Sequence, residues 1–230
     1  MKRPNFRERG FTLVEMIFVL AIILTLVAIF LPLATSKLSD ANTTRTKADE
    51  DAISAAMTAF FSDLSIWPAS NGDTRTNQSL DHLFVGDGGA TITSINPTTA
   101  GTNWHSGSPP NSFDSGAAPS GSSATIANAF NHLAVNNPNV NNTEGDSNDY
   151  KPKSGNKGWR GPYIAKLASD PYGNNYVINI GAITNTGTGL VAGEKGWILS
   201  AGPNGLLNTG AKDSSTSSDD IGYIFCTNCQ

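Results

Sequence analysis

The hydrophobic pattern of the chain begins with an apolar run at residues 11–31, in which Glu15 is the only charged residue. About 20 apolar residues suffice for a helix to cross a bilayer, so this run predicts a membrane-spanning helix. Pro32 follows at once. A proline inside a helix removes one backbone hydrogen bond, so a kink is expected where the helix leaves the membrane.

Residues 35–64 continue the helical pattern with a more polar composition. Small and polar positions recur at steps of three and four residues, namely Leu38, Ala41, Arg45, Ala48, Ala52, Ala55 and Ala59. A bulkier stripe occupies the second half, namely Ile53, Met57, Phe60 and Leu64. Such a face needs a cover, and a sheet is expected to supply it. The Ile-Trp-Pro tripeptide at residues 66–68 is expected to end the helix.

Three short runs in the last third of the chain are rich in β-branched and aromatic residues. They are YVINI at residues 176–180, GWILS at 196–200 and IGYIF at 221–225. Turns rich in Gly and Asn separate them, which is typical of an antiparallel meander. The predicted fold is therefore α+β, with a long N-terminal helix whose C-terminal half packs against a small antiparallel β-sheet.

The middle of the chain, at about residues 85–157, is predicted to be a polar insertion. Between residues 88 and 143 the only charged residue is Asp114. One short helix is expected there, from Ile126, Ala129, Phe130 and Leu133. The rest is expected to lie on the surface, either as a solvated loop or as a contact or adhesive surface.

The charge of the chain is unevenly distributed. The first ten residues carry four basic side chains and one acidic one, or +3, so the remainder of a chain with net charge -4 carries -7. The lack of a basic patch in the body argues against nucleic acid as a partner. A basic segment before an apolar run is typical of a cytoplasmic flank. A cleaved secretory signal is the alternative, but its apolar core is usually only about 7–15 residues.

Glu15 is unusual because a carboxylate near the middle of a membrane costs about 2.5–3.5 kcal/mol and usually has a partner. No Lys or Arg lies between residues 11 and 36. The side chain could reach the lipid headgroups, but that does not explain why it lies five residues after Gly10, at the end of a basic leader.

The segment GFTLVEMIFVLAIILTLVAI, at residues 10–29, closely resembles the class III signal of type IV pilins and of type II secretion pseudopilins. The resemblance implies that a prepilin peptidase cuts after Gly10 and that the new amino terminus, Phe11, becomes N-methylated. It also implies a partner for Glu15, namely the amino group of Phe11 on a neighbouring subunit. Their attraction in a low-dielectric filament core would set the register between subunits.

Two segments of the globular part, GWRGPYI at residues 158–164 and DPYGNNY at 170–176, resemble the major pseudopilin of type II secretion. Both have the Gly, Pro and Asn of tight turns, and their aromatic residues Trp159, Tyr163 and Tyr172 are expected to fill core space. LDHLF, at residues 80–84, has a weak likeness to a helix of that family.

LSAGPNGLL at residues 199–207 and SSDDIG at 217–222 resemble the loop that binds calcium in the major pseudopilin. The resemblance implies five ligands, with side chains from Asn204, Asp219 and Asp220 and backbone carbonyls from Ala201 and Leu206. Asn204 stands where the family has an acid, so weaker Ca²⁺ binding is expected, for which Asp213 could compensate. A solvated acidic turn is the alternative.

Cys226 and Cys229 form a C-x-x-C pair at the end of the sequence. A disulfide is favoured for a domain outside the cytoplasm. A thioredoxin-like site would need a βαβ setting, haem attachment would need a His at position 230, and a zinc site would need two further ligands.

The domain organisation that follows has four parts. Residues 1–10 are a cleaved basic leader, 11–34 the transmembrane and assembly half of the helix, 35–64 its amphipathic half, and 65–230 a globular pilin-like domain. We expect a single-pass protein of the bacterial inner membrane, with its C-terminal domain in the periplasm, that later enters a filament.

No motif of a catalytic nucleophile or a phosphate-binding loop occurs, so an enzyme is not expected. The favoured function is a structural subunit of a type II secretion pseudopilus, a homopolymeric filament that drives protein export. Its expected partners are prepilin peptidase, the inner-membrane assembly platform, minor pseudopilins or pilins, and membrane lipid before assembly. The alternatives are a type IV pilus subunit with an adhesive insertion, and a membrane-anchored binding module that does not polymerise.

Overall fold

The computed structural model describes residues 10–69, 80, 82–86, 128–138, 149–151, 158–165, 168–183 and 195–227. The basic leader before residue 10 and most of the predicted insertion lie outside these residues. The chain divides into two compact units, Met1–Asn42 and Thr43–Gln230, which we describe separately.

Helix α1, Leu13–Leu64, begins in the first unit and includes Pro32 within its span. In the first unit its large apolar side chains are exposed, by between 46% for Val19 and 75% for Leu13. By length and composition this helix is long and apolar enough to cross a membrane. The predicted apolar helix is therefore confirmed, and its exposed surface needs lipid or protein to cover it.

The second unit contains a four-stranded antiparallel sheet in the order β1-β2-β3-β4 among the described residues. Its strands are β1 His82–Val85, β2 Tyr176–Asn179, β3 Gly196–Ser200 and β4 Ile221–Cys226. The three predicted strands, β2 to β4, are confirmed, and so is the α+β fold.

The likeness of residues 80–84 to a helix is wrong for residues 82–84, because these belong to strand β1, whereas residue 81 lies outside the described residues. The four residues of β1 are all buried, and they pair with β2 from His82 opposite Asn179 to Val85 opposite Tyr176. A short run of one histidine and three apolar residues has no clear period of its own, so pairing with the edge of β2 decides its conformation.

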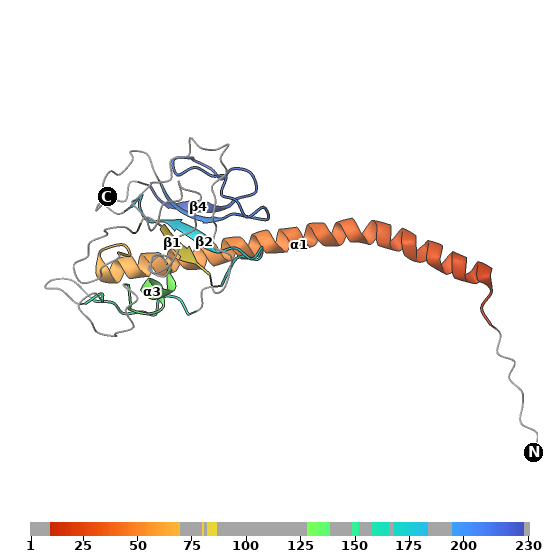
Figure 1. Cartoon of the computed structure of the whole chain (residues 1–230), viewed down its shortest axis with the longest axis horizontal. Helices are drawn as coiled ribbons and strands as arrows, with labels where there is room; N and C mark the ends of the chain where they lie inside the picture. The colour runs from red at the N-terminus through yellow and green to blue at the C-terminus, as the bar shows by residue number, and fades with distance from the viewer. Residues whose placement is uncertain are drawn as a thin grey trace, which may run out of the picture. The chain divides into compact units, whose positions relative to one another are not determined.

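The core lies between the sheet and the C-terminal half of α1. Figure 1 shows the strands along one side of this part of the helix. The predicted stripe is confirmed, since Ile53, Met57, Phe60 and Leu64 are at most 2% exposed. Burying an apolar side chain of this size contributes about 1.5–3 kcal/mol, so this stripe is a major source of the unit's stability.

The predicted short helix is confirmed over Phe130–Leu133, as α3, with Ala129 as its N-cap, whereas Ile126 lies outside the described residues. Leu133 is fully buried, and the N–H of Ala129 donates to the carbonyl of Phe84 on β1 at 2.8 Å. Tyr150 is 1% exposed, and its ring lies edge-on to Phe60 with centroids 5.0 Å apart. Parts of the predicted polar insertion therefore supply core residues to the globular unit.

The Tyr150 hydroxyl connects three segments of this unit. It donates to the carbonyl of Ala69 at 3.0 Å and accepts from the N–H of the same residue at 3.0 Å. His132 Nδ1 lies 2.6 Å from the same oxygen. The hydroxyl thus joins the segment after α1 to α3 through buried hydrogen bonds.

The two pseudopilin-like motifs surround the end of α1 and the start of β2. Trp159 and Tyr163 pack against the core, with the Tyr163 ring 5.5 Å from that of Phe60. Asp170 closes the second motif, because its Oδ1 accepts the N–H of Tyr172 and of Asn174 at 3.0 and 2.7 Å. Tyr172 itself is only half-buried, so it fills less core space than expected.

Candidate assembly site and candidate metal loop

The predicted processing site lies just before α1. Gly10 and Phe11 are exposed and precede the first helical turn, and a Cβ added at Gly10 would meet no atom within 4 Å. The peptide bond between them is thus accessible to a peptidase, and cleavage there stays a prediction.

Thr12 and Glu15 form a reciprocal cap at the start of α1. Glu15 Oε2 accepts hydrogen bonds from the N–H and the hydroxyl of Thr12, at 2.8 and 2.9 Å. In return the N–H of Glu15 donates to Thr12 Oγ1 at 3.3 Å. This arrangement is a capping box, which satisfies backbone donors that a helix otherwise leaves unpaired at its N-terminus.

The capping box gives Glu15 a partner within its own subunit, which the sequence analysis missed. The signal was present, since Thr-x-x-Glu ahead of an apolar run is the capping-box pattern. Both hydrogen bonds reach the carboxylate at Oε2. The second oxygen, Oε1, is thereby left to accept a donor from outside the subunit.

The loop between β3 and β4 contains the predicted metal ligands, and it brings two of them together. Asn204 donates to both oxygens of Asp219, through its backbone N–H at 2.9 Å and through Nδ2. Asn204 Oδ1 accepts the N–H of Leu206 at 2.6 Å, so the amide nitrogen faces Asp219. Hydrogen bonds from the neutral side chain thus close the loop.

Asp220 is directed to a different part of the same loop. Its Oδ2 accepts the N–H groups of Asn208 and Thr209 and the hydroxyl of Thr209, at 2.7–2.8 Å. The residue is 5% exposed, and its Oδ1 is buried without a hydrogen-bond partner. Burial raises the pKa of the Asp220 carboxyl, and these hydrogen bonds oppose that rise.

The remaining predicted ligands have other neighbours. Ala201 is fully buried, and the carbonyl of Leu206 accepts Asn208 Nδ2 at 3.0 Å. Asp213 Oδ2 accepts the N–H of Gly210 within its own turn at 2.7 Å. Within the described part of the chain no group of three His, Cys, Asp or Glu side chains could hold a metal.

The loop nevertheless fits a calcium ion in its chemistry, because its side-chain and carbonyl ligands are oxygens. The buried Oδ1 of Asp220 is the observation that favours a cation, since an unpaired buried carboxylate oxygen is costly. The five ligands stay a prediction.

Cys226 ends β4, is 6% exposed, and is disulfide-bonded. Cys229 lies outside the residues that the structure describes. The pairing of these two cysteines therefore stays a prediction.

The comparison with family models found the prokaryotic N-terminal methylation motif at residues 5–31, a minor part of the chain. No curated protein and no solved structure matches the chain. Together the motif and the α+β fold support a type IV pilin-like class of protein, whose members are structural subunits. The motif further implies processing by a prepilin peptidase, membrane anchoring and pilin-type assembly.

Proposed function

We propose that this protein is a filament subunit of a type II secretion pseudopilus. The observation that carries the proposal is the start of α1, where one capped carboxylate, Glu15, lies in an otherwise apolar and exposed helical surface. In a plain membrane anchor the capping box would use only Oε2 of that carboxylate and would leave its Oε1 without a role. A filament uses it, because the amino group of a neighbouring Phe11 is its complementary charge.

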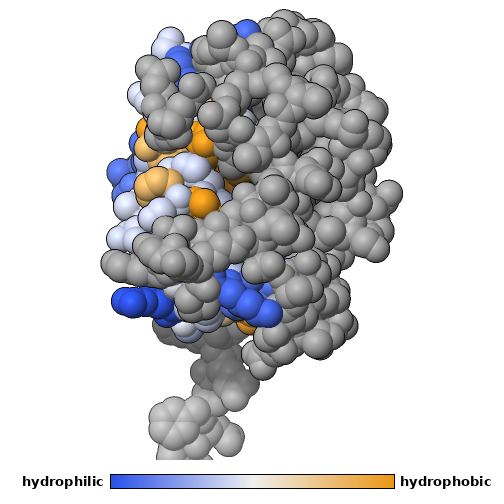
Figure 2. Space-filling model, turned by 90° about the vertical axis from the view of Figure 1, so that its left-hand side faces the viewer, coloured by the Kyte–Doolittle hydropathy of each residue, from blue (hydrophilic) through white to orange (hydrophobic). Residues whose placement is uncertain are grey.

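The apolar surface of the first unit contrasts with that of the second. Among described residues of the second unit, the exposed large apolar side chains are Phe61, Phe130 and Leu206. Figure 2 shows one face of this unit, where apolar atoms lie beside hydrophilic ones. The continuous apolar surface thus lies on the first unit, so we assign subunit association to the N-terminal half of α1.

The choice of a pseudopilus over a pilus rests on the globular unit. Its two pseudopilin-like motifs support the end of α1 through Trp159 and Tyr163 and shape the turn before β2 through Asp170. The rival is a type IV pilus subunit, major or minor, which the long polar insertion favours as an adhesive surface.

The test is Glu15→Ala in cells that assemble the filament, with Asp40→Asn as the matched control. Asp40 is an exposed carboxylate of the same unit, outside the apolar run. Glu15→Ala is expected to insert in the membrane but to form no filaments, or filaments of altered register, whereas the control assembles normally. Normal filaments from Glu15→Ala would refute the assembly role.

Deletion of the whole protein separates the two kinds of filament. Loss of protein export with unchanged adhesion supports the pseudopilus. Loss of surface pili or adhesion with unchanged export supports the pilus instead.

We also propose that the β3–β4 loop binds Ca²⁺ through Asn204, Asp219 and Asp220. The unpaired Oδ1 of Asp220 supports this assignment. An ion bound only by the folded state stabilises it, and at a hundredfold excess over Kd the gain is about 2.7 kcal/mol.

A further inference from the structure

Glu50 is a carboxyl group that α1 buries inside the globular unit. Its side chain is on the face that packs against the sheet, and the residue is 1% exposed. The N–H of Ser200 at the end of β3 donates to this carboxyl, but Oε1 has no hydrogen-bond partner. A charged carboxylate in such a place loses its hydration without adequate replacement.

Asp170, an acidic residue that acts on Glu50 from outside α1, has a much better supply of hydrogen-bond donors. Its Oδ2 accepts the hydroxyl of Ser200 at 2.6 Å, and its Oδ1 accepts two backbone N–H groups. Asp170 also acts electrostatically on Glu50 and disfavours its negative charge. Ser200 thus contacts both carboxyl groups, and Glu50 is the one with too few donors.

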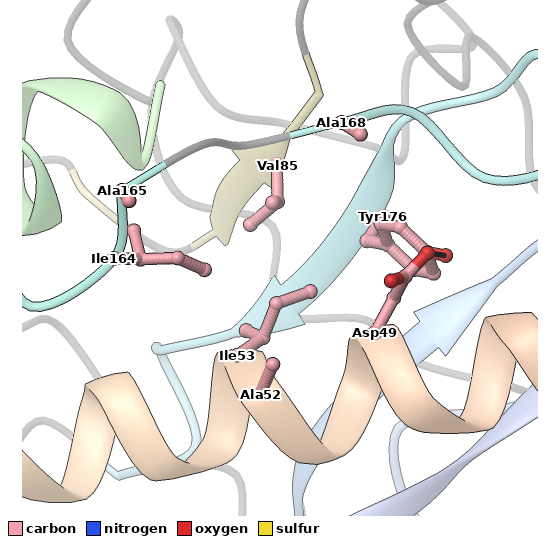
Figure 3. Close-up of a pocket in the computed structure, with 8 residues that line it drawn as sticks. All are labelled: Asp49, Ala52, Ile53, Val85, Ile164, Ala165, Ala168 and Tyr176. Carbon is pink, nitrogen blue, oxygen red and sulfur yellow. Dashed lines mark hydrogen bonds between the residues drawn. The ribbon is translucent and has the colours of Figure 1, made fainter.

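Asp49, the residue before Glu50, shows the ordinary alternative on the same helix. Figure 3 shows its carboxylate beside the ring of Tyr176, at the edge of a cavity of about 250 Å³. The Tyr176 hydroxyl donates to Asp49 Oδ2 at 3.0 Å, and Arg45 Nε lies 3.6 Å from the same atom. Asp49 therefore has a side-chain hydroxyl donor and a cation, whereas the donor described for Glu50 is the single backbone N–H of Ser200.

The charged and titratable groups that face Glu50 come from each element around it. They are Lys47 and Asp51 on α1, Asp170 before β2, Tyr176 on β2 and Tyr223 on β4. Burial raises the pKa of Glu50 to about 8, with Asp51 adding to the rise and Lys47 opposing it. At neutral pH the neutral acid therefore predominates.

We infer that the Glu50 carboxyl is a proton-operated latch between α1 and the end of β3. In its neutral form it completes the packing of the helix on the sheet. In its ionised form it has no adequate set of donors, so this part of the helix loosens from Ser200 and Asp170. The pH of the surrounding compartment thus controls how firmly the helix is held.

The direction of the pH dependence follows from proton linkage. The folded unit keeps the Glu50 proton up to about pH 8, whereas an exposed glutamate loses it near pH 4.5. Stability from this group is fully present below about pH 4.5, declines as the pH rises, and is lost above about pH 8. Between these two pH values the equilibrium constant for opening of the α1 segment around Glu50 rises by up to about tenfold per pH unit.

Hydrogen exchange of the full chain in detergent micelles tests the latch. The measured quantity is the opening equilibrium constant of the amides of residues 46–57, after correction for the intrinsic pH dependence of amide exchange. We expect this constant to rise by up to about a hundredfold from pH 6 to pH 8. Glu50→Gln keeps the shape and an acceptor for Ser200 but cannot ionise, so its opening should be constant. A rise that persists in Glu50→Gln, or no rise in the unaltered protein, would overturn the inference.

Infrared spectroscopy of the same preparations supplies a readout that a purely structural role would not change. The carbonyl band of a protonated carboxylic acid should disappear with a midpoint near pH 8 and be absent from Glu50→Gln. Lys47 and Asp51, the two charged neighbours of Glu50 on α1, are exposed, so they can be changed without altering the core. Asp51→Asn should move the midpoint to lower pH, and Lys47→Gln to higher pH. An unmoved midpoint in both variants would refute the assignment.

Discussion

Replacing Asn204 with Asp tests how the β3–β4 loop is closed. In the structure the Asn204 amide donates from Nδ2 to Asp219, and its Oδ1 accepts the N–H of Leu206. The variant keeps an acceptor for Leu206 but loses the donor to Asp219. It also places two carboxylates side by side, so the loop should open unless a cation binds between them.

The magnitude can be estimated from these contacts. A hydrogen bond to a charged group contributes about 1.5–3 kcal/mol, and Asn204 is exposed, so the lower end applies. Repulsion between two carboxylates about 4 Å apart in water adds about 1 kcal/mol. Without metal the variant should thus lose about 2.5 kcal/mol, which lowers the melting temperature of a protein of this size by about 5–10 °C.

Calcium should reverse this loss, because the variant has three carboxylates among the predicted side-chain ligands where the natural sequence has two. The assay is thermal unfolding of the full chain in detergent micelles, with a chelator and with millimolar calcium. Calcium should stabilise the natural protein less than it stabilises Asn204→Asp. Asn204→Ala should be less stable than the natural protein, and its response to calcium should be no larger. If Asn204→Asp melts like the natural protein in chelator, the amide does not close the loop. If no form responds to calcium, the loop is not a calcium site.

Two further variants test processing and the core. Gly10→Val should abolish cleavage without affecting the fold, since no atom lies near the Gly10 position, and the intact mass should then include the leader. A mature protein that begins elsewhere would contradict this. Tyr150→Phe should cost about 2–4 kcal/mol in urea unfolding, because it removes the buried hydrogen bonds that the hydroxyl makes with Ala69 and His132. Tyr172→Phe, at a half-buried tyrosine, is the control. Equal losses of stability in Tyr150→Phe and Tyr172→Phe would refute the role of the Tyr150 hydroxyl.

The elements that the sequence predicted correctly are those with a clear period or composition. The stripe from Ile53 to Leu64 repeats at helical steps, and β2 to β4 are rich in β-branched and aromatic residues. Strand β1 was missed because its conformation depends on pairing with β2, which is distant in the sequence. Tyr150 was missed as a core residue because its neighbours are polar, so no local pattern marks its burial.

The candidate metal loop shows a second limit of sequence reasoning. Asp219 and Asp220 are adjacent, and the resemblance treats them as one pair of ligands. In the structure they accept hydrogen bonds from separate segments, Asp219 from Asn204 and Asp220 from residues 208 and 209. Ser218, just before them, has a positive φ of 60°, which turns the chain at this point. A motif conveys the kinds of residue in a site but not the side to which each one points.

The capping box changes the physical account of Glu15. Before assembly the subunit must keep this carboxylate in or near the membrane without a neighbouring amine. Thr12 supplies two donors to Oε2 at that stage, and an acid in the first turn is also favoured by the helix dipole, by about 0.3–1 kcal/mol. These contacts reduce the cost of the single subunit, whereas Oε1 stays free to accept from the next one. The proposed bond to a neighbouring Phe11 therefore adds to the cap and does not replace it, so assembly gains the ion pair without first breaking the start of the helix.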